Sequence, residues 1–182
     1  MFEELLAGTS VTTLVHWLHE PETRQAVIIP GLLSLAILAF YARRGRISDR
    51  LQLLWVLALP VSFYCARWQD GADGSGMGAL YIYSAFSVAC ALLLFMRVYV
   101  SPALAFALTF LSLWLVDVTH ALCRALECGV PLDQFYLGVG GAGVQDALVL
   151  VPLLTAATVA YAARRIRSRG ERLAEVLPPL IR

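Results

Sequence analysis

The stretch ALAFALTFLSLWLVDVTHALC, residues 103–123, decides the class of this protein. Its single acidic residue is Asp117, and its length matches the roughly 20 mostly apolar residues that a helix needs to cross a bilayer. The whole chain has the same character, because 59% of its 182 residues are hydrophobic and 15% are charged. In a soluble domain roughly 45–50% of the residues are hydrophobic and about 25% are charged. The composition therefore excludes a soluble domain, and it also excludes a disordered chain and a disulfide scaffold.

Further stretches of similar length and apolarity lie on both sides of this one. The sequence predicts an all-α polytopic membrane protein with five transmembrane helices, at about residues 25–42, 51–66, 78–96, 103–123 and 144–163. No loop is long enough to fold separately, so we expect a single integral membrane domain covering residues 1–182. It divides into an outer-surface segment (1–24), a five-helix bundle (25–163) and a basic cytoplasmic tail (164–182).

The arginines predict how the bundle lies in the membrane, because basic residues concentrate in cytoplasmic loops. Five spans place eleven arginines on one side and three on the other. The first group is Arg43, Arg44, Arg46, Arg50, Arg97, Arg164, Arg165, Arg167, Arg169, Arg172 and Arg182; the second is Arg24, Arg67 and Arg124. The expected topology is therefore N-terminus out and C-terminus in.

The basic residues are all arginine, and the chain contains neither lysine nor asparagine. Codons for these two amino acids are AT-rich, so their absence favours a bacterial genome of high GC content. We therefore expect a multi-pass protein of a bacterial inner membrane. Anionic lipid at the arginine-rich tail is one expected partner. A second copy of the chain or another membrane protein is the other, because five short helices make a thin bundle; we expect no nucleic-acid partner and no cofactor.

The N-terminal segment has the pattern of a helix that lies on the membrane surface. Val11, Leu14, Val15 and Leu18 recur with helical spacing, opposite a polar face. On that polar face His16, His19 and Glu20 are weak candidate metal ligands. Polar side chains facing solvent are the alternative interpretation, and we favour it.

Asp117 is the polar residue that most needs an explanation, because a carboxylate inside a spanning helix is costly and usually functional or paired. His120 follows one turn later on the same side, and Asp146 opens the last predicted span at a similar depth. Three interpretations remain open for Asp117, His120 and Asp146. They hold helices together, form a proton or ion pathway, or act as a catalytic acid–base site.

Small residues predict where helices approach closely. The glycine-rich run GGAGVQD at residues 140–146 favours backbone contact, and Gly143 with Ala147 forms a pair of small residues four positions apart. Stripes of small and hydroxyl residues on the third and fifth predicted spans, which include Ser87 and Thr155, indicate contacts within or between subunits. Cys65, Cys123 and Cys128 lie toward the outer side, where a disulfide or free thiols are both open alternatives.

These observations leave two classes of function. We favour a non-enzymatic membrane component, such as a small transporter, a channel, a sensor or an accessory subunit. The alternative is an intramembrane enzyme that acts on a lipid or a lipid-linked substrate through Asp117, His120 and Asp146. The two classes differ in whether these side chains converge on one site.

Overall fold

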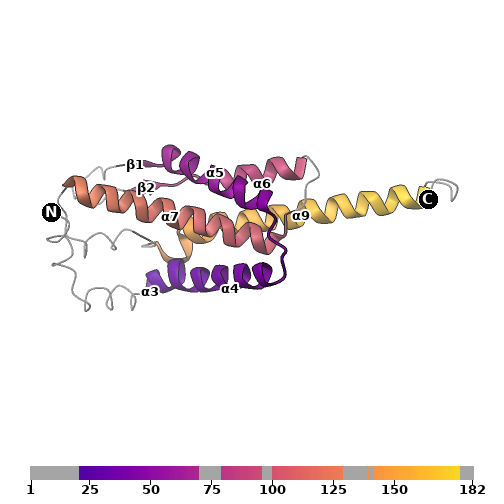
Figure 1. The fold of residues 1–182 in the computed structure, drawn as a ribbon, viewed down its shortest axis with the longest axis horizontal. Helices are drawn as coiled ribbons and strands as arrows, with labels where there is room; N and C mark the ends of the chain where they lie inside the picture. The colour runs from indigo at the N-terminus through magenta and orange to yellow at the C-terminus, as the bar shows by residue number, and fades with distance from the viewer. Residues whose placement is uncertain (1–20, 70–78, 96–99, 129–138, 140–141, 177–182) are drawn as a thin grey trace.

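The computed structural model describes residues 21–69, 79–95, 100–128, 139 and 142–176. These residues form a bundle of helices whose long axis is continued by the C-terminal helix (Figure 1). The first helical run covers Pro21–Arg43. It consists of α3 (Pro21–Thr23), the π-helix η1 (Arg24–Ile28) and α4 (Ile29–Arg43).

A Schellman motif ends α4. The N–H of Arg46 donates to the carbonyl of Tyr41 and the N–H of Gly45 donates to that of Ala42, while Gly45 adopts a φ of +60°. The chain then turns into α5 (Asp49–Cys65), whose N-terminus is capped by Ser48. The Ser48 hydroxyl accepts a hydrogen bond from the N–H of Leu51.

A short antiparallel ribbon separates α5 from the next helix. Strand β1 (Arg67–Gln69) pairs with β2 (Ala79–Tyr81), with Trp68 opposite Leu80. Trp68 in β1 and Tyr81 in β2 are aromatic residues of the kind that favours extended backbone. Ser84 then starts α6 (Ala85–Phe95), because its hydroxyl accepts from the N–H of Ser87.

The longest apolar helix, α7 (Pro102–Cys128), lies at the centre of the bundle. Of the 18 most apolar consecutive residues of α7, 61% are buried inside the structure. For the corresponding stretches of the first helical run and of α9 (Ala147–Val176), the buried share is 22%. The one-turn 3₁₀-helix η3 (Gly143–Gln145) precedes α9. Past the bundle, α9 continues as one helix beyond the other elements (Figure 1).

Three described helices are long and apolar enough to cross a membrane: Pro21–Arg43, Pro102–Cys123 and Ala147–Ile166. They correspond to the first, fourth and fifth predicted spans, so the structure supports a membrane-embedded helical protein. The second predicted span matches α5, but the third is shorter than expected. Helix α5 has 17 residues and α6 has 11, because the ribbon takes up the beginning of the third predicted span.

Neighbouring helices are joined by uncharged hydrogen bonds. The indole N–H of Trp55 in α5 donates to the Leu108 carbonyl (2.9 Å) and the Ser112 hydroxyl (2.8 Å) of α7. Ser87 of α6 bonds to Thr155 of α9 at 2.9 Å, which joins the two stripes that the sequence singled out. In a bilayer such bonds average about 0.6 kcal/mol each, so the bundle depends on several of them together with close packing.

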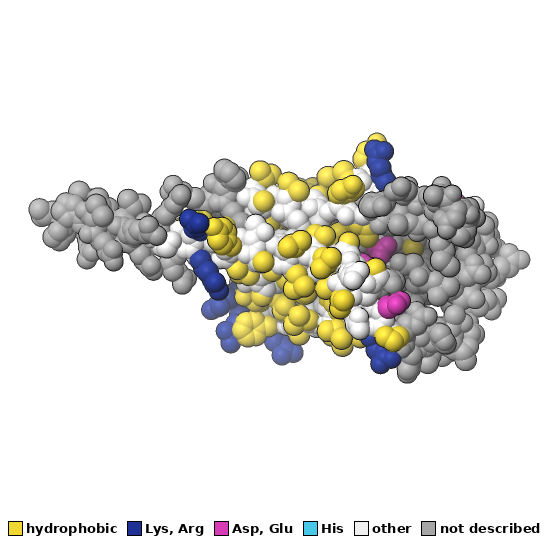
Figure 2. Space-filling model, turned by 180° about the vertical axis from the view of Figure 1, so that it is seen from behind, with side chains coloured by type: hydrophobic (Ala, Val, Ile, Leu, Met, Phe, Trp, Pro, Cys, Tyr) yellow, Lys and Arg dark blue, Asp and Glu magenta, His cyan; other side chains and the backbone are white. Residues whose placement is uncertain are grey.

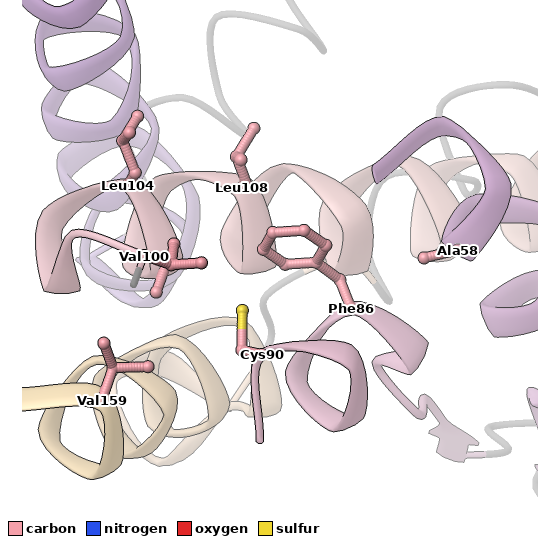
Figure 3. Close-up of a cluster of buried hydrophobic side chains, with 8 residues drawn as sticks. Ala58, Phe86, Cys90, Val100, Leu104, Leu108 and Val159 are labelled. Carbon is pink, nitrogen blue, oxygen red and sulfur yellow. The ribbon is translucent and has the colours of Figure 1, made fainter. Parts of the chain in front are cut away.

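Two buried clusters lie toward opposite ends of the bundle. One gathers Phe86 and Cys90 of α6, the start of α7 and Val159 of α9. Figure 3 shows the Phe86 ring and the Cys90 thiol directed toward α7. Cys90 is 1% exposed, so its thiol packs as a small apolar side chain. The other cluster joins η1, the middle of α7 and the start of α9.

The two ends also differ in charge. Glu22, Asp117 and Asp146 lie around the cluster that joins η1, α7 and the start of α9, and we call this the carboxylate end. At the opposite end lie the turn after α4 and the part of α9 beyond Val159, and we call it the arginine end. Figure 2 shows most of the visible dark blue side chains toward the arginine end, the magenta ones toward the other, and an apolar surface between them.

Candidate functional site

A buried stripe on α7 holds the main candidate residue. Phe110, Leu113, Asp117 and Ala121 recur with helical spacing, and all four are buried, Asp117 with 7% of its surface exposed. A Cβ atom on Gly31 would lie 3.6 Å from the Phe110 ring, so the stripe packs against α4. Leu113 and Ala121, which flank Asp117, belong to the buried cluster that includes Ala26, Val27 and Leu148. Asp117 therefore faces the interior of the bundle, between the first helical run and α9.

Asp146 is fixed by its position at the start of α9. Its Oδ1 accepts a hydrogen bond of 2.9 Å from the N–H of Leu148, and its backbone is extended with ψ of 146°. This is the geometry of an N-cap, where a carboxylate also interacts favourably with the helix dipole. The Asp146 carboxylate is close enough to Asp117 for the two charges to interact. The structure thus brings together these two of the three predicted residues.

His120 is directed toward a different neighbour. Its Nε2 lies 2.9 Å from the carbonyl oxygen of Phe63, and its ring stacks on the Phe63 ring with centroids 4.2 Å apart and planes 22° apart. Because α5 supplies both contacts, His120 connects α7 to the end of α5. The helical spacing that suggested a pair with Asp117 places the two side chains about 60° apart around the helix.

Two features of this region were not assigned to the site from the sequence. Gly143 has a φ of +58°, and a Cβ atom there would lie 3.2 Å from Oε1 of Gln25 in the π-helix η1. The turn before α9 thus rests directly on η1, and π-helical turns are frequent at functional sites. Close contact at Gly143 was expected, but its partner could not be read from the glycine-rich run.

Trp114 is the second such feature. Its indole N–H, one helical turn before Asp117, is buried and has no acceptor within the described part of the chain. Tryptophan N–H groups usually find a partner when they are buried. Trp114 is one of many apolar residues in the predicted span, so the sequence does not indicate that its N–H lacks an acceptor.

Metal binding has no support from the described residues, among which no group of three or more His, Cys, Asp or Glu side chains is placed to hold an ion. The weak candidates His16, His19 and Glu20 lie outside the described residues. Cys65 and Cys123 are exposed free thiols, and the side chain of Cys128 is not described.

Comparison with protein-family models, with curated proteins and with solved structures found no match for this chain. The interpretation of the site therefore rests on its own residues and contacts.

Proposed function

We propose that this chain is a non-enzymatic component of a bacterial inner membrane that takes up a proton or a small cation at Asp117. The class includes transporters, channels, sensors and accessory subunits, acting as an oligomer or with a membrane partner. The observation that carries the proposal is the position of Asp117, which is buried inside the bundle with a second carboxylate as an electrostatic neighbour. An ionised carboxylate at such a depth is costly, so binding of a proton or cation stabilises it.

The proposal includes five membrane crossings with the N-terminus outside and the C-terminus inside. Successive helices alternate in direction: Tyr41 at the end of α4 bonds to Ser101 before α7, and Ser62 near the end of α5 accepts from the N–H of Ala85 at the start of α6. The exposed surface between the two ends is rich in apolar side chains, including Leu32 of α4, Leu57 of α5 and Leu154 of α9. This is the surface that lipid would cover.

Infrared difference spectroscopy of the full chain in lipid nanodiscs tests the role of Asp117. We expect a carboxyl C=O signal that changes with pH or with added sodium, and that Asp117→Asn removes while the folded yield stays near that of the parent. The matched control is Asp49→Asn, which changes an exposed carboxylate in the first turn of α5. A signal unchanged by Asp117→Asn, or removed equally by Asp49→Asn, contradicts the proposal. Ion flux into proteoliposomes then separates a transporter or channel from a sensor or accessory subunit.

An intramembrane enzyme is the alternative, and the interaction between the two carboxylates is the observation that favours it. A pair of interacting carboxyl groups can divide the roles of acid and base. His120, the third residue of the predicted acid–base site, contacts Phe63 of α5 instead of these carboxylates. Incubation with a bacterial lipid extract, followed by lipid mass spectrometry, checks this alternative. A lipid product formed by the parent and lost in Asp117→Asn would replace the non-enzymatic proposal.

A further inference from the structure

We propose that the arginine end binds the phosphate groups of anionic phospholipids through a set of exposed arginines, which we call the arginine collar. Its members come from the end of α4, the turn after it, the start of α5 and the part of α9 that leaves the bundle: Arg43, Arg44, Arg46, Arg50, Arg164 and Arg165. This site lies at the opposite end from Asp117 and does not depend on the function proposed there. It also differs from the tail alone, because the segment from the end of α4 to the start of α5 supplies four of its members.

Packing brings the two segments of the collar to the same end of the bundle. The Tyr41 hydroxyl lies 2.6 Å from the Ser101 hydroxyl, which joins the end of α4 to the start of α7. Val159 of α9 is buried in one cluster with Val100, and Ile47 from the turn packs against that cluster. Arg164 follows Val159 by little more than one turn of α9. It therefore lies at the same level of the bundle as the connection between α4 and α5.

The charge of the collar is largely uncompensated. Within residues 43–50 and 159–166, which supply the collar, the six arginines face one carboxylate, Asp49. Asp49 lies in the first turn of α5, where the helix N-terminus already stabilises it. A surface with this excess of positive charge is complementary to a negatively charged leaflet.

Aromatic side chains orient two members of the collar. The guanidinium carbon of Arg44 lies 4.2 Å from the centre of the Phe40 ring. Arg165 donates from Nε to the Tyr161 hydroxyl at 2.9 Å and lies over that ring at 5.3 Å. Both contacts leave further guanidinium N–H groups free to bind a phosphate in a bidentate manner, and a pre-oriented arginine loses less entropy when it does so.

A phospholipid fits this site better than free phosphate because apolar surface adjoins the collar. Phe40 and Tyr161 are 46% and 59% exposed, and exposed Leu33 and Leu154, each seven residues earlier in the same helix, continue the apolar surface away from the arginines. A phosphate bound by Arg44 or Arg165 would therefore have its acyl chains beside these side chains. A free anion gains nothing from that surface.

The test measures thermal unfolding of the full chain in mild detergent with added phosphatidylglycerol, phosphatidylcholine or inorganic phosphate. We expect phosphatidylglycerol to raise the Tm and the other two to leave it nearly unchanged, with the increase weakened by high salt. Arg44→Gln combined with Arg165→Gln should remove at least half of the increase. The control Arg67→Gln, an exposed arginine at the other end, should retain it.

A second variant keeps the proposal testable if the glutamine pair folds poorly. Arg44→Lys combined with Arg165→Lys retains the charge but loses the planar guanidinium, so a partial loss of the increase is expected. Equal increases from phosphatidylcholine, or from inorganic phosphate, would overturn the assignment to anionic lipid. An increase that is the same in both double variants as in the parent would overturn the assignment to these arginines.

Discussion

The two ends of the bundle each contain a glycine with positive φ, and the surroundings of the two glycines differ. Gly45 has a φ of +60°, a Cβ atom added to it would meet nothing within 4 Å, and it closes a turn through local backbone hydrogen bonds. Gly143, with φ of +58°, lies against Gln25 and Glu22 of the first helical run. At Gly45 the chain reversal is thus fixed by local turn geometry, whereas the turn at Gly143 is fixed by contact with a distant segment.

The largest expected effect concerns which end faces the cytoplasm. A periplasm-reporting enzyme fused after Arg182 should be inactive, and one inserted at Gly74 should be active, because the predicted five spans place eleven of the arginines on the side of the C-terminus. Activity assays on cells carrying each fusion measure this directly. An active fusion after Arg182 would reverse the assignment of both ends.

Replacing each glycine by alanine compares the two ends in free energy. Gly45→Ala should lower stability by about 1–2 kcal/mol, the cost of left-handed backbone for a residue with a Cβ. Gly143→Ala carries the same cost and adds roughly 1 kcal/mol or more, because its Cβ presses on the Gln25 side chain. Chemical unfolding in mild detergent gives both values. Adding Gln25→Ala to Gly143→Ala should recover part of the excess, and equal losses for the two glycines would contradict the difference between the ends.

The smallest expected effect is the loss of one hydrogen bond at the arginine end. Tyr41→Phe removes the hydroxyl that pairs with Ser101 and should cost about 0.6 kcal/mol. Ser101→Ala should cost a similar amount, and the double variant should lose little more than either single variant. Thermal unfolding of the three variants measures the coupling. Fully additive losses would show that the two hydroxyls act independently.

The parts of the fold that could be predicted are those set by local composition. The lengths of the apolar stretches located the three helices that can span a membrane. Gly45 follows arginines at the end of α4, which is the usual pattern at the C-terminus of a helix. The start of α6 could not be predicted in the same way. Its residues are apolar enough to extend the span upstream, but pairing of β2 with β1 and the hydroxyl of Ser62 fix the helix at Ala85 instead.

The candidate site was predictable residue by residue but not as an arrangement. A carboxylate within an apolar stretch made Asp117 conspicuous, and the end of the glycine-rich run did the same for Asp146. Their proximity depends on how α9 packs against α7, which no local pattern encodes. The spacing of His120 relative to Asp117 was compatible with a pair, but the carbonyl and ring of Phe63, distant in sequence, take up its side chain.

Helix α9 runs unbroken from the turn capped by Asp146, past the collar arginines Arg164 and Arg165, to Val176. Its 30 residues correspond to a length of about 45 Å, and the helix continues through Pro152 without interruption. A change in charge at the capping carboxylate that tilts or rotates the first turn would be carried mechanically along this helix. The far end would then move without any intervening loop to absorb the displacement, so the half-buried carboxylate of Asp146 and the projecting end of α9 would move together.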